Sequence, residues 1–180
     1  LGVGNDVIAL AQTGTGKTAA YGLPVLQKVD PTQRTTQAVI LSPTRELCLQ
    51  IADDLKDYSR YIDGLHVQAV YGGTSIESQI RSLKRGAQVI VATPGRLIDL
   101  MERGVAKLEN VENVVLDEAD EMLNMGFTES IDAILAGVPE NRNTLFFSAT
   151  MSREIERIAR NYLHDHKEIV VGSRNEGAEN

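Results

Sequence analysis

The sequence predicts an α/β fold of three layers, in which helices cover both faces of a mostly parallel sheet of about seven strands. Short apolar runs recur along the chain, as expected for strands buried on both faces. They are Val7–Ala11, Ala38–Leu41, Val67–Tyr71, Val89–Ala92, Val114–Leu116, Leu145–Phe147 and Ile169–Val171. Segments with helical stripes separate them, such as Leu47, Ile51 and Leu55, then Ile76, Ile80 and Leu83, then Ile155, Ile158 and Tyr162. Because a parallel connection requires a crossover, this alternation favours parallel strands.

The length and composition indicate one globular domain. The chain has 180 residues, of which 42% are apolar and 24% are charged. We assign residues 1–171 to this domain and the polar stretch 172–180 to a linker or tail. Within the first predicted helix, Pro24 is expected to kink or end the helix, because proline lacks a backbone donor and clashes with the preceding turn.

Several classes of protein are disfavoured by the sequence. No apolar run approaches the roughly 20 residues of a membrane-spanning helix, and the N-terminus lacks the pattern of a secretory signal. We therefore expect a cytoplasmic, monomeric domain with no membrane contact. The single cysteine, Cys48, stands in an apolar helical stripe, which indicates a buried residue rather than a reactive thiol. His164 and His166 have no further ligand cluster near them, so no structural metal is expected.

The charge and the positions of polar residues indicate where a ligand binds. The formal net charge of −7 argues against a broad nucleic-acid-binding surface, so any such contact must be local. It would depend on a few arginines, backbone N–H groups and helix N-termini. Parallel sheets hold ligands at the carboxyl ends of their strands, and polar residues follow the predicted strands there. They come after Ala11, Leu41, Tyr71, Ala92, Leu116 and Phe147.

The segment AQTGTGKT follows the first predicted strand and opens a helix, which is the context of a phosphate-binding loop. Its glycines allow backbone N–H groups to turn towards phosphates, and the helix N-terminus adds a favourable dipole. Lys17 is expected to reach the β- and γ-phosphates, and the Thr18 hydroxyl to bind Mg²⁺. A glycine-rich turn with an incidental lysine is the structural alternative. The predicted ATP-binding residues are Ala11, Gln12, Thr13, Gly14, Thr15, Gly16, Lys17 and Thr18.

The segment DEAD, Asp117–Asp120, directly follows an apolar run, where we expect a neighbouring strand to bring carboxylates beside the phosphate loop. Asp117 is predicted to hold Mg²⁺, usually through water, because Mg²⁺ prefers oxygen ligands and keeps much of its hydration. Glu118 is predicted to orient and deprotonate the attacking water. Acidic residues are also favoured in the first turn of a helix, so a solvated helix start is the alternative for this segment alone.

Six motifs follow one another along the chain: AQTGTGKT at Ala11–Thr18, PTREL at Pro43–Leu47, GG at Gly72–Gly73, TPGR at Thr93–Arg96, DEAD at Asp117–Asp120 and SAT at Ser148–Thr150. In these motifs and their order the chain resembles the DEAD-box ATPases of helicase superfamily 2, and in particular their N-terminal RecA-like domain. The likeness covers nearly all of the chain, and Ala11 is itself common at its position in that family. The resemblance implies an ATP-dependent RNA helicase, an RNA-stimulated ATPase that uses ATP and Mg²⁺, with Lys17, Asp117 and Glu118 at its catalytic centre.

The resemblance also implies that PTREL, the double glycine and TPGR form a surface that binds RNA. The residue types fit, because threonine hydroxyls and arginines bind phosphates and both longer segments precede predicted helices. Such contacts read no base edge, so binding should depend little on sequence. Taken singly, PTREL could be a helix start with a threonine cap and a surface ion pair, TPGR a turn, and the glycines a loop. The predicted RNA-binding residues are Pro43, Thr44, Arg45, Glu46, Gly72, Gly73, Thr93, Pro94, Gly95 and Arg96.

SAT resembles the element that couples nucleotide state to RNA binding in that family. Ser148 and Thr150, which flank Ala149, are expected to hydrogen-bond towards the DEAD segment. Asp120 is expected to pair with polar groups near these two residues rather than with the metal. A strand end of small residues that permits close packing is the alternative for this segment.

Two parts of the family's helicase core are not expected within the chain. Only ten residues precede Ala11, where the family carries an adenine-recognising glutamine segment. The family's second RecA-like domain, which carries arginine fingers, would follow residue 180. Since an arginine finger contributes about 10³- to 10⁵-fold in rate, we expect this chain alone to hydrolyse ATP poorly and to unwind no duplex.

Two other classes of protein share part of this pattern. Another P-loop enzyme, such as a small-molecule kinase or a DNA translocase, would share the loop and the acidic strand end but not PTREL, TPGR and SAT together. A non-catalytic scaffold would keep the fold, but the intact residues Lys17, Asp117 and Glu118 argue against it. Preference for RNA over DNA would separate the first class, since the 2′-hydroxyl discriminates the two nucleic acids.

Overall fold

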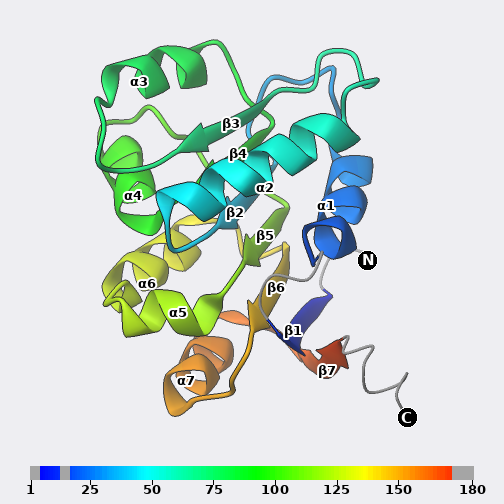
Figure 1. Ribbon diagram of the computed structural model, residues 1–180, viewed down its shortest axis with the longest axis vertical. Coiled ribbons are helices and arrows are strands. Elements are labelled where there is room, and N and C mark those ends of the chain that lie inside the picture. Colours follow the sequence, from blue (N-terminus) through cyan, green and yellow to red (C-terminus); the bar gives the residue numbers. More distant parts are fainter. Residues whose placement is uncertain (1–4, 13–16, 172–180) are drawn as a thin grey trace.

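A parallel sheet of seven strands forms the middle layer of the structure (Figure 1). The computed structural model describes residues 5–12 and 17–171. The order of strands across the sheet is β3-β4-β2-β5-β6-β1-β7, and all six neighbouring pairs are parallel. The predicted fold class is therefore confirmed. The strands are β1 (Asp6–Ala11), β2 (Ala38–Leu41), β3 (Val67–Val70), β4 (Val89–Ala92), β5 (Asn113–Leu116), β6 (Asn143–Ser148) and β7 (Lys167–Val171).

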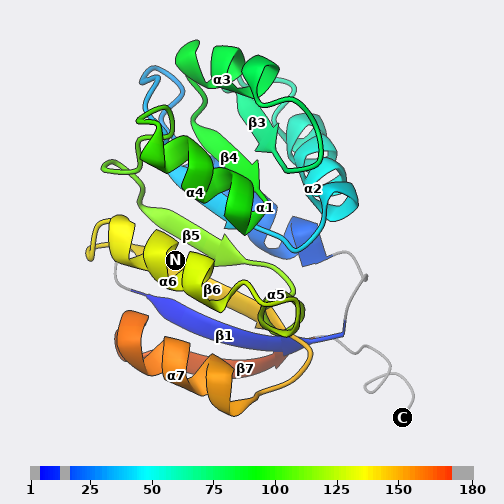
Figure 2. The same cartoon turned by 90° about the vertical axis from the view of Figure 1, so that its left-hand side faces the viewer.

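Helices cover both faces of the sheet and bury a separate apolar core on each (Figure 2). Successive residues of a strand point to opposite faces, so Ile8 packs in one core and Ala9 in the other. One face packs against α1 (Lys17–Lys28) and α2 (Arg45–Tyr58). The other face packs against α3 (Glu77–Lys84), α4 (Pro94–Glu102), α5 (Ala119–Asn124), α6 (Thr128–Gly137) and α7 (Arg153–Tyr162).

The expectation that Pro24 would kink or end the first helix is wrong as far as its end is concerned. Helix α1 continues through Pro24 to Lys28. A proline inside a helix removes one backbone hydrogen bond and costs about 3 kcal/mol. The buried side chains of Val25 and Leu26, which follow the proline, keep this half of the helix on the sheet and offset that cost.

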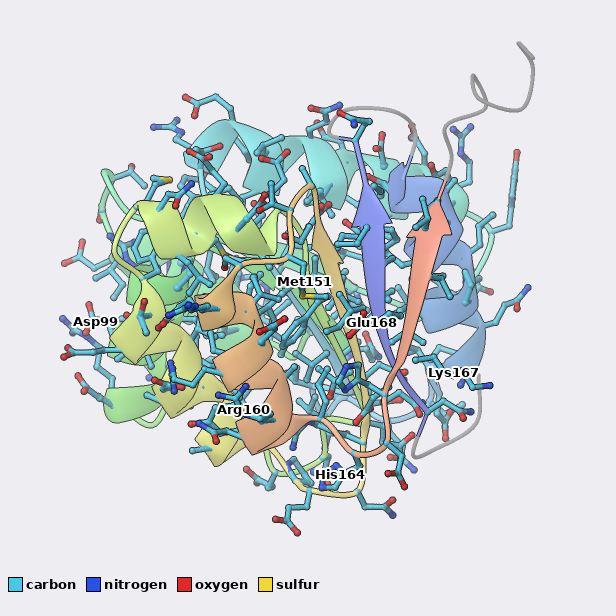
Figure 3. All side chains as sticks on the ribbon, turned by 90° about the horizontal axis from the view of Figure 1, so that it is seen from below. Asp99, Met151, Arg160, His164, Lys167 and Glu168 are labelled. Carbon is cyan, nitrogen blue, oxygen red and sulfur yellow. The ribbon has the colours of Figure 1, made fainter. Side chains whose placement is uncertain are left out.

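Strand β7 is not buried on both faces, contrary to the prediction for its apolar run. It is the last strand of the described sheet and pairs only with β1. Val170 is 80% exposed and Ile169 is 45% exposed. Figure 3 shows the charged residues Lys167 and Glu168 at the start of the strand. Charged residues on an edge strand discourage pairing with another chain.

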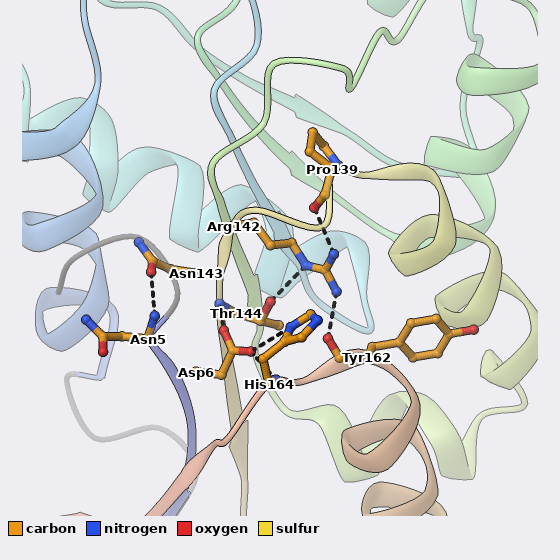
Figure 4. Close-up of polar contacts among 8 residues, drawn as sticks. All are labelled: Asn5, Asp6, Pro139, Arg142, Asn143, Thr144, Tyr162 and His164. Carbon is orange, nitrogen blue, oxygen red and sulfur yellow. Dashed lines mark hydrogen bonds and ion pairs between the residues drawn. The ribbon is translucent and has the colours of Figure 1, made fainter.

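A polar cluster joins β1, β6 and the segment before β7 at the amino ends of the strands (Figure 4). The Asp6 carboxylate, which is 3% exposed, accepts hydrogen bonds from the backbone N–H groups of Thr144 at 2.9 Å and His164 at 2.6 Å. The buried Arg142 guanidinium donates to two backbone carbonyl oxygens, each at 2.8 Å. These bonds join β1, β6 and the connection from α7 to β7. They lie at the amino ends of the strands, away from the edge where ligands are expected.

We predict that Asp6→Ala lowers the free energy of unfolding by about 2–3 kcal/mol, because two backbone donors lose their acceptor. Asp6→Asn keeps one acceptor oxygen and should cost less. Urea unfolding followed by circular dichroism measures both variants. Wild-type stability in Asp6→Ala would show that these two bonds contribute nothing to the fold.

Candidate active site

The carboxyl ends of β1, β5 and β6 bring three of the predicted motifs to one edge of the sheet. Ala11 ends β1 and Gln12 follows it, while Thr18 lies in the first turn of α1. Residues 13–16 and the side chain of Lys17 lie outside the described part of the chain, so their predicted contacts with phosphate stay predictions. DEAD follows β5, and SAT begins at the end of β6.

The expectation that the DEAD strand neighbours the phosphate-loop strand is wrong. Strand β6 lies between β1 and β5 and pairs with both. The order of strands depends on how distant helices pack, and no local pattern in the sequence records it. As a result, the SAT segment lies between the end of β1 and the DEAD segment.

Tyr21 of α1 bridges the distance from the phosphate loop to the DEAD strand. Its hydroxyl donates to Asp117 Oδ2 at 2.9 Å, and the Thr18 side chain lies close enough to the same hydroxyl to influence its pKa. The ring packs on Phe147 of β6, with 5.5 Å between ring centroids. Both residues predicted to bind Mg²⁺, Thr18 and Asp117, therefore meet at one phenol.

Burial of Tyr21 and Asp117 defines the electrostatics of this contact. Tyr21 is 2% exposed and Asp117 is 4% exposed. Burial raises the pKa of the Tyr21 phenol well above its ordinary value, and the Asp117 carboxylate raises it further. The phenol therefore stays protonated and remains a donor at neutral pH. No role for Tyr21 was predicted from the sequence. The feature that could have indicated it is the position of a hydroxyl-bearing aromatic residue about one helical turn after Thr18.

Glu118 has a strained backbone. Its φ of 55° and ψ of 53° lie in the left-handed region, and it precedes the first residue of α5. This conformation costs a residue other than glycine roughly 1–2 kcal/mol. Strain of this kind concentrates at functional sites, where it fixes the direction of a side chain. The strain supports the predicted role of Glu118, although that role stays a prediction.

The SAT segment is tied to DEAD through one of its two hydroxyl residues. Asp120 Oδ2 accepts from the Thr150 backbone N–H at 3.2 Å and from the Thr150 hydroxyl at 3.0 Å, as expected. The Ser148 hydroxyl donates to the Thr150 carbonyl at 2.7 Å, so the expectation that it bonds towards DEAD is wrong. Ser148 instead closes the turn that presents Thr150, and Ala149 in that turn is exposed.

PTREL and TPGR begin helices at the carboxyl ends of β2 and β4. Thr44 is the N-cap of α2, and its hydroxyl accepts from the Leu47 N–H at 3.2 Å. The cap proposed as a structural alternative is therefore present. Among the described residues Arg45 has no ion-pair partner, and its guanidinium lies 5.1 Å from the centre of the Tyr71 ring. Thr93, the N-cap of α4, is only 8% exposed.

The accessible part of this surface is smaller than the predicted set of RNA-binding residues. Pro43 and Pro94 are buried, whereas Arg45, Glu46 and the three glycines are exposed, namely Gly72, Gly73 and Gly95. Along the edge, GG, TPGR and PTREL follow β3, β4 and β2, and DEAD, SAT and the phosphate loop follow β5, β6 and β1. The segments predicted to bind RNA thus lie on one half of the edge, and those predicted to bind the nucleotide lie on the other half. The two halves meet between β2 and β5.

Cys48 behaves as predicted. It is fully buried, and burial raises the pKa of its thiol to about 12, so it is not a reactive thiolate. Within residues 5–12 and 17–171, no group of three or more His, Cys, Asp or Glu residues could hold a metal ion. In the same part of the chain, no helix has the length and apolar character needed to cross a membrane.

The sheet order and the loops at its carboxyl edge define a RecA-like nucleotide-binding domain. Comparison with known structures supports this class. A DEAD box protein from the hyperthermophile Methanococcus jannaschii superposes with a TM-score of 0.88 and 41% identity, over 95% of this chain and 46% of that one. A hypothetical ATP-dependent RNA helicase from Sulfolobus tokodaii superposes with a TM-score of 0.84 and 41% sequence identity. This match covers 93% of this chain and 48% of that one.

The family is established by sequence. The family model for the DEAD/DEAH box helicase matches residues 1–158. The chain is 52% identical over 171 residues to the DEAD-box ATP-dependent RNA helicase CshA of Streptococcus pneumoniae, and 46% identical over 170 residues to the ATP-dependent RNA helicase DeaD of Escherichia coli. These alignments cover 95% and 94% of this chain, but only 32% and 27% of the relatives. The chain belongs to the DEAD/DEAH box helicase family.

We predict that Tyr21→Phe lowers the free energy of unfolding by about 1–3 kcal/mol, because the buried Asp117 carboxylate loses a donor while the packing volume stays the same. Tyr61→Phe is the matched control, since Tyr61 is 89% exposed and should be neutral. Urea unfolding compares the two variants. Equal stability of the two would show that the phenol does not support Asp117.

Proposed function

We propose that this chain is the ATP-binding N-terminal core domain of an ATP-dependent RNA helicase, and that the full-length protein couples ATP binding and hydrolysis to RNA binding and duplex unwinding. One observation carries the proposal: the Tyr21 hydroxyl joins Thr18, at the end of the phosphate-binding sequence, to Asp117 of DEAD. Membership of the DEAD/DEAH box helicase family and the names of the relatives support it.

In the nucleotide half, Ala11–Thr18 binds the phosphates of ATP and Lys17 pairs with the β- and γ-phosphates. Thr18 and Asp117 fit Mg²⁺, because they offer a hydroxyl and a buried carboxylate, both oxygen donors. When bound, Mg²⁺ neutralises charge on the phosphates. Glu118 orients the attacking water and accepts its proton, from a position fixed by the strained turn after Asp117.

In the RNA half, the N-termini of α2 and α4 and the arginines of PTREL and TPGR bind the sugar-phosphate backbone with little regard to sequence. The glycines support this role. A Cβ atom built on Gly72 or Gly95 meets nothing within 4 Å, and neither residue has a positive φ. Nothing within the described structure therefore requires glycine at these positions, whereas close approach of a ligand to the backbone does.

The two halves are coupled through SAT. Asp120 at the start of α5 bonds to Thr150 after β6, the strand that pairs with both β1 and β5. A shift of DEAD on nucleotide binding is transmitted to this turn through those bonds. We also propose that a second RecA-like domain of the same polypeptide faces this edge, completes the active site with arginine fingers and contributes to the RNA site, and that the protein acts in the cytoplasm.

We predict that Glu118→Gln retains Mg²⁺-dependent ATP binding but lowers RNA-stimulated hydrolysis by about 10²-fold or more, because the water loses its general base. Lys17→Ala should abolish ATP binding. Fluorescent-nucleotide titration and phosphate release, with and without single-stranded RNA, measure both steps in the full-length protein. Undiminished hydrolysis in Glu118→Gln would exclude its catalytic role.

The 180-residue chain provides a further test of the same proposal. It should bind ATP with negligible turnover, because the second domain supplies part of the active site. Brisk turnover that is abolished by Glu118→Gln would show that the chain is catalytically complete and that the two-domain proposal is wrong.

We predict opposite effects of Gly95→Ala on stability and on RNA binding. Alanine in the exposed first turn of α4 should raise the free energy of unfolding by about 0.5–1 kcal/mol, and the added methyl group should weaken RNA binding several-fold. Gly73→Ala is the contrasting variant, because its φ of +84° makes alanine strained and destabilising. Fluorescence anisotropy with single-stranded RNA and thermal unfolding measure the two effects. Unchanged RNA affinity in a stabilised Gly95→Ala would contradict the proposed contact.

A further inference from the structure

Gln79 of α3 is a buried amide among exposed residues. It is 4% exposed, while its neighbours Glu77 and Ser78 are exposed. A buried amide must find hydrogen-bond partners for both its carbonyl and its NH₂ group, so its contacts define its role. None of the residues predicted to contact RNA or ATP lies in α3, and the proposed function gives Gln79 no task.

The first pair of contacts clasps the backbone of Tyr71. Gln79 Nε2 donates to the Tyr71 carbonyl at 3.2 Å, and the Tyr71 N–H donates to Gln79 Oε1 at 3.3 Å. Tyr71 directly follows the end of β3 at Val70 and precedes Gly72. The side chain of Gln79 therefore takes the part of a neighbouring strand at this residue. It fixes the point from which the Gly72–Gly73 turn leaves the sheet.

A second contact reaches TPGR. Arg96 Nη1 donates to Gln79 Oε1 at 3.0 Å, and Arg96 Nη2 donates to the Thr74 carbonyl at 2.9 Å. The guanidinium is thereby held between α3 and the loop that follows the double glycine. An arginine carries five N–H donors, so donors remain on Arg96 for a phosphate.

PTREL is connected to Gln79 indirectly, through Tyr71. The Arg45 guanidinium lies over the ring of Tyr71, 5.1 Å from its centre. Such a contact holds a cation in place without neutralising it. Gln79 thus connects the segments that follow β2, β3 and β4. It bonds directly to Tyr71 and Arg96, and the Tyr71 ring in turn contacts Arg45.

The neutrality of Gln79 has an electrostatic consequence. The chain carries a formal net charge of −7, so attraction to RNA depends on a few local cations. A carboxylate at this position would accept the same bond from Arg96 but would neutralise its charge. An amide accepts the bond and leaves the positive charge available to a phosphate.

We propose that Gln79 is a positioning residue for RNA binding, which holds Arg96 and the Gly72–Gly73 turn in the arrangement that fits an RNA backbone. This role rests on the proposed function and deepens it, since it adds a residue that contacts no ligand itself. Gln79 preorganises three segments that would otherwise have to be ordered when RNA binds, and preorganisation of this kind increases affinity.

The test uses the full-length protein with Gln79→Met, which keeps the length of the side chain and removes its hydrogen bonds. The concentration of single-stranded RNA needed for half-maximal ATPase activity should rise about tenfold, as expected for the loss of one charge-assisted contact. The KM for ATP and the kcat at saturating RNA should stay within about twofold. Ser78→Ala, an exposed neighbour on α3, is the control and should change none of these values.

A double-mutant cycle separates positioning from a purely structural role. In an Arg96→Ala background, Gln79→Met should weaken RNA binding by clearly less than in the wild type, because part of its effect passes through Arg96. Full additivity would overturn the proposal. Gln79→Glu serves if the methionine variant fails to fold, since it keeps the acceptor for Arg96 and should still weaken RNA binding, with a shallower dependence on salt.

The outcomes also separate this proposal from the proposed function. A wild-type ATPase that RNA neither binds nor stimulates would overturn the proposed function, whatever Gln79 does. A wild-type protein that RNA stimulates, with the same RNA dependence in folded Gln79→Met, would overturn the positioning role alone.

Discussion

The parallel direction of all seven strands is the constraint on which the rest of the structure depends. Because each strand ends at the same edge, every connection that begins there is brought beside the others, whatever its distance in sequence. The buried strands supply a rigid base, and the loops above them carry the polar chemistry. The amino ends are closed by Asp6 and Arg142, whose bonds serve the fold and leave the opposite edge for ligands.

The position of β6 gives this edge its particular organisation. Since β6 separates β1 from β5, side chains must span the distance between the phosphate loop and DEAD. Tyr21 does so across the ring of Phe147, whereas Asp120 reaches the turn after β6, where it bonds to Thr150. Strand β6 is thus a spacer between the two segments. In the proposed function, a change in the position of DEAD reaches the turn after β6 through the bonds from Thr150 to Asp120.

Much of the fold was predictable because each strand is a short apolar run and each helix has an apolar stripe, both of which are local patterns. The motifs were predictable because their residue types have direct chemical uses. Three features were not predictable, since each depends on packing between distant segments. They are the order of the strands, the exposure of β7 and the continuation of α1 beyond Pro24. Tyr21 and Gln79 were missed for the same reason: a tyrosine or glutamine on a helix acquires its role only from the strand ends that it meets.

In the proposed RNA-binding half, the glycines and the buried amide address one physical problem. An acidic chain gains little from general attraction to RNA, so its few cations must be held where phosphates pass. Gln79 achieves this from beneath the surface by fixing Arg96 and the backbone before Gly72. Gly72 and Gly95 leave the backbone accessible at the surface, although a Cβ atom at either position would meet no atom of the described structure within 4 Å. In this proposal, affinity comes from a few preorganised cations and backbone contacts rather than from a broad positive surface, which permits binding to any sequence while the net charge of the domain stays negative.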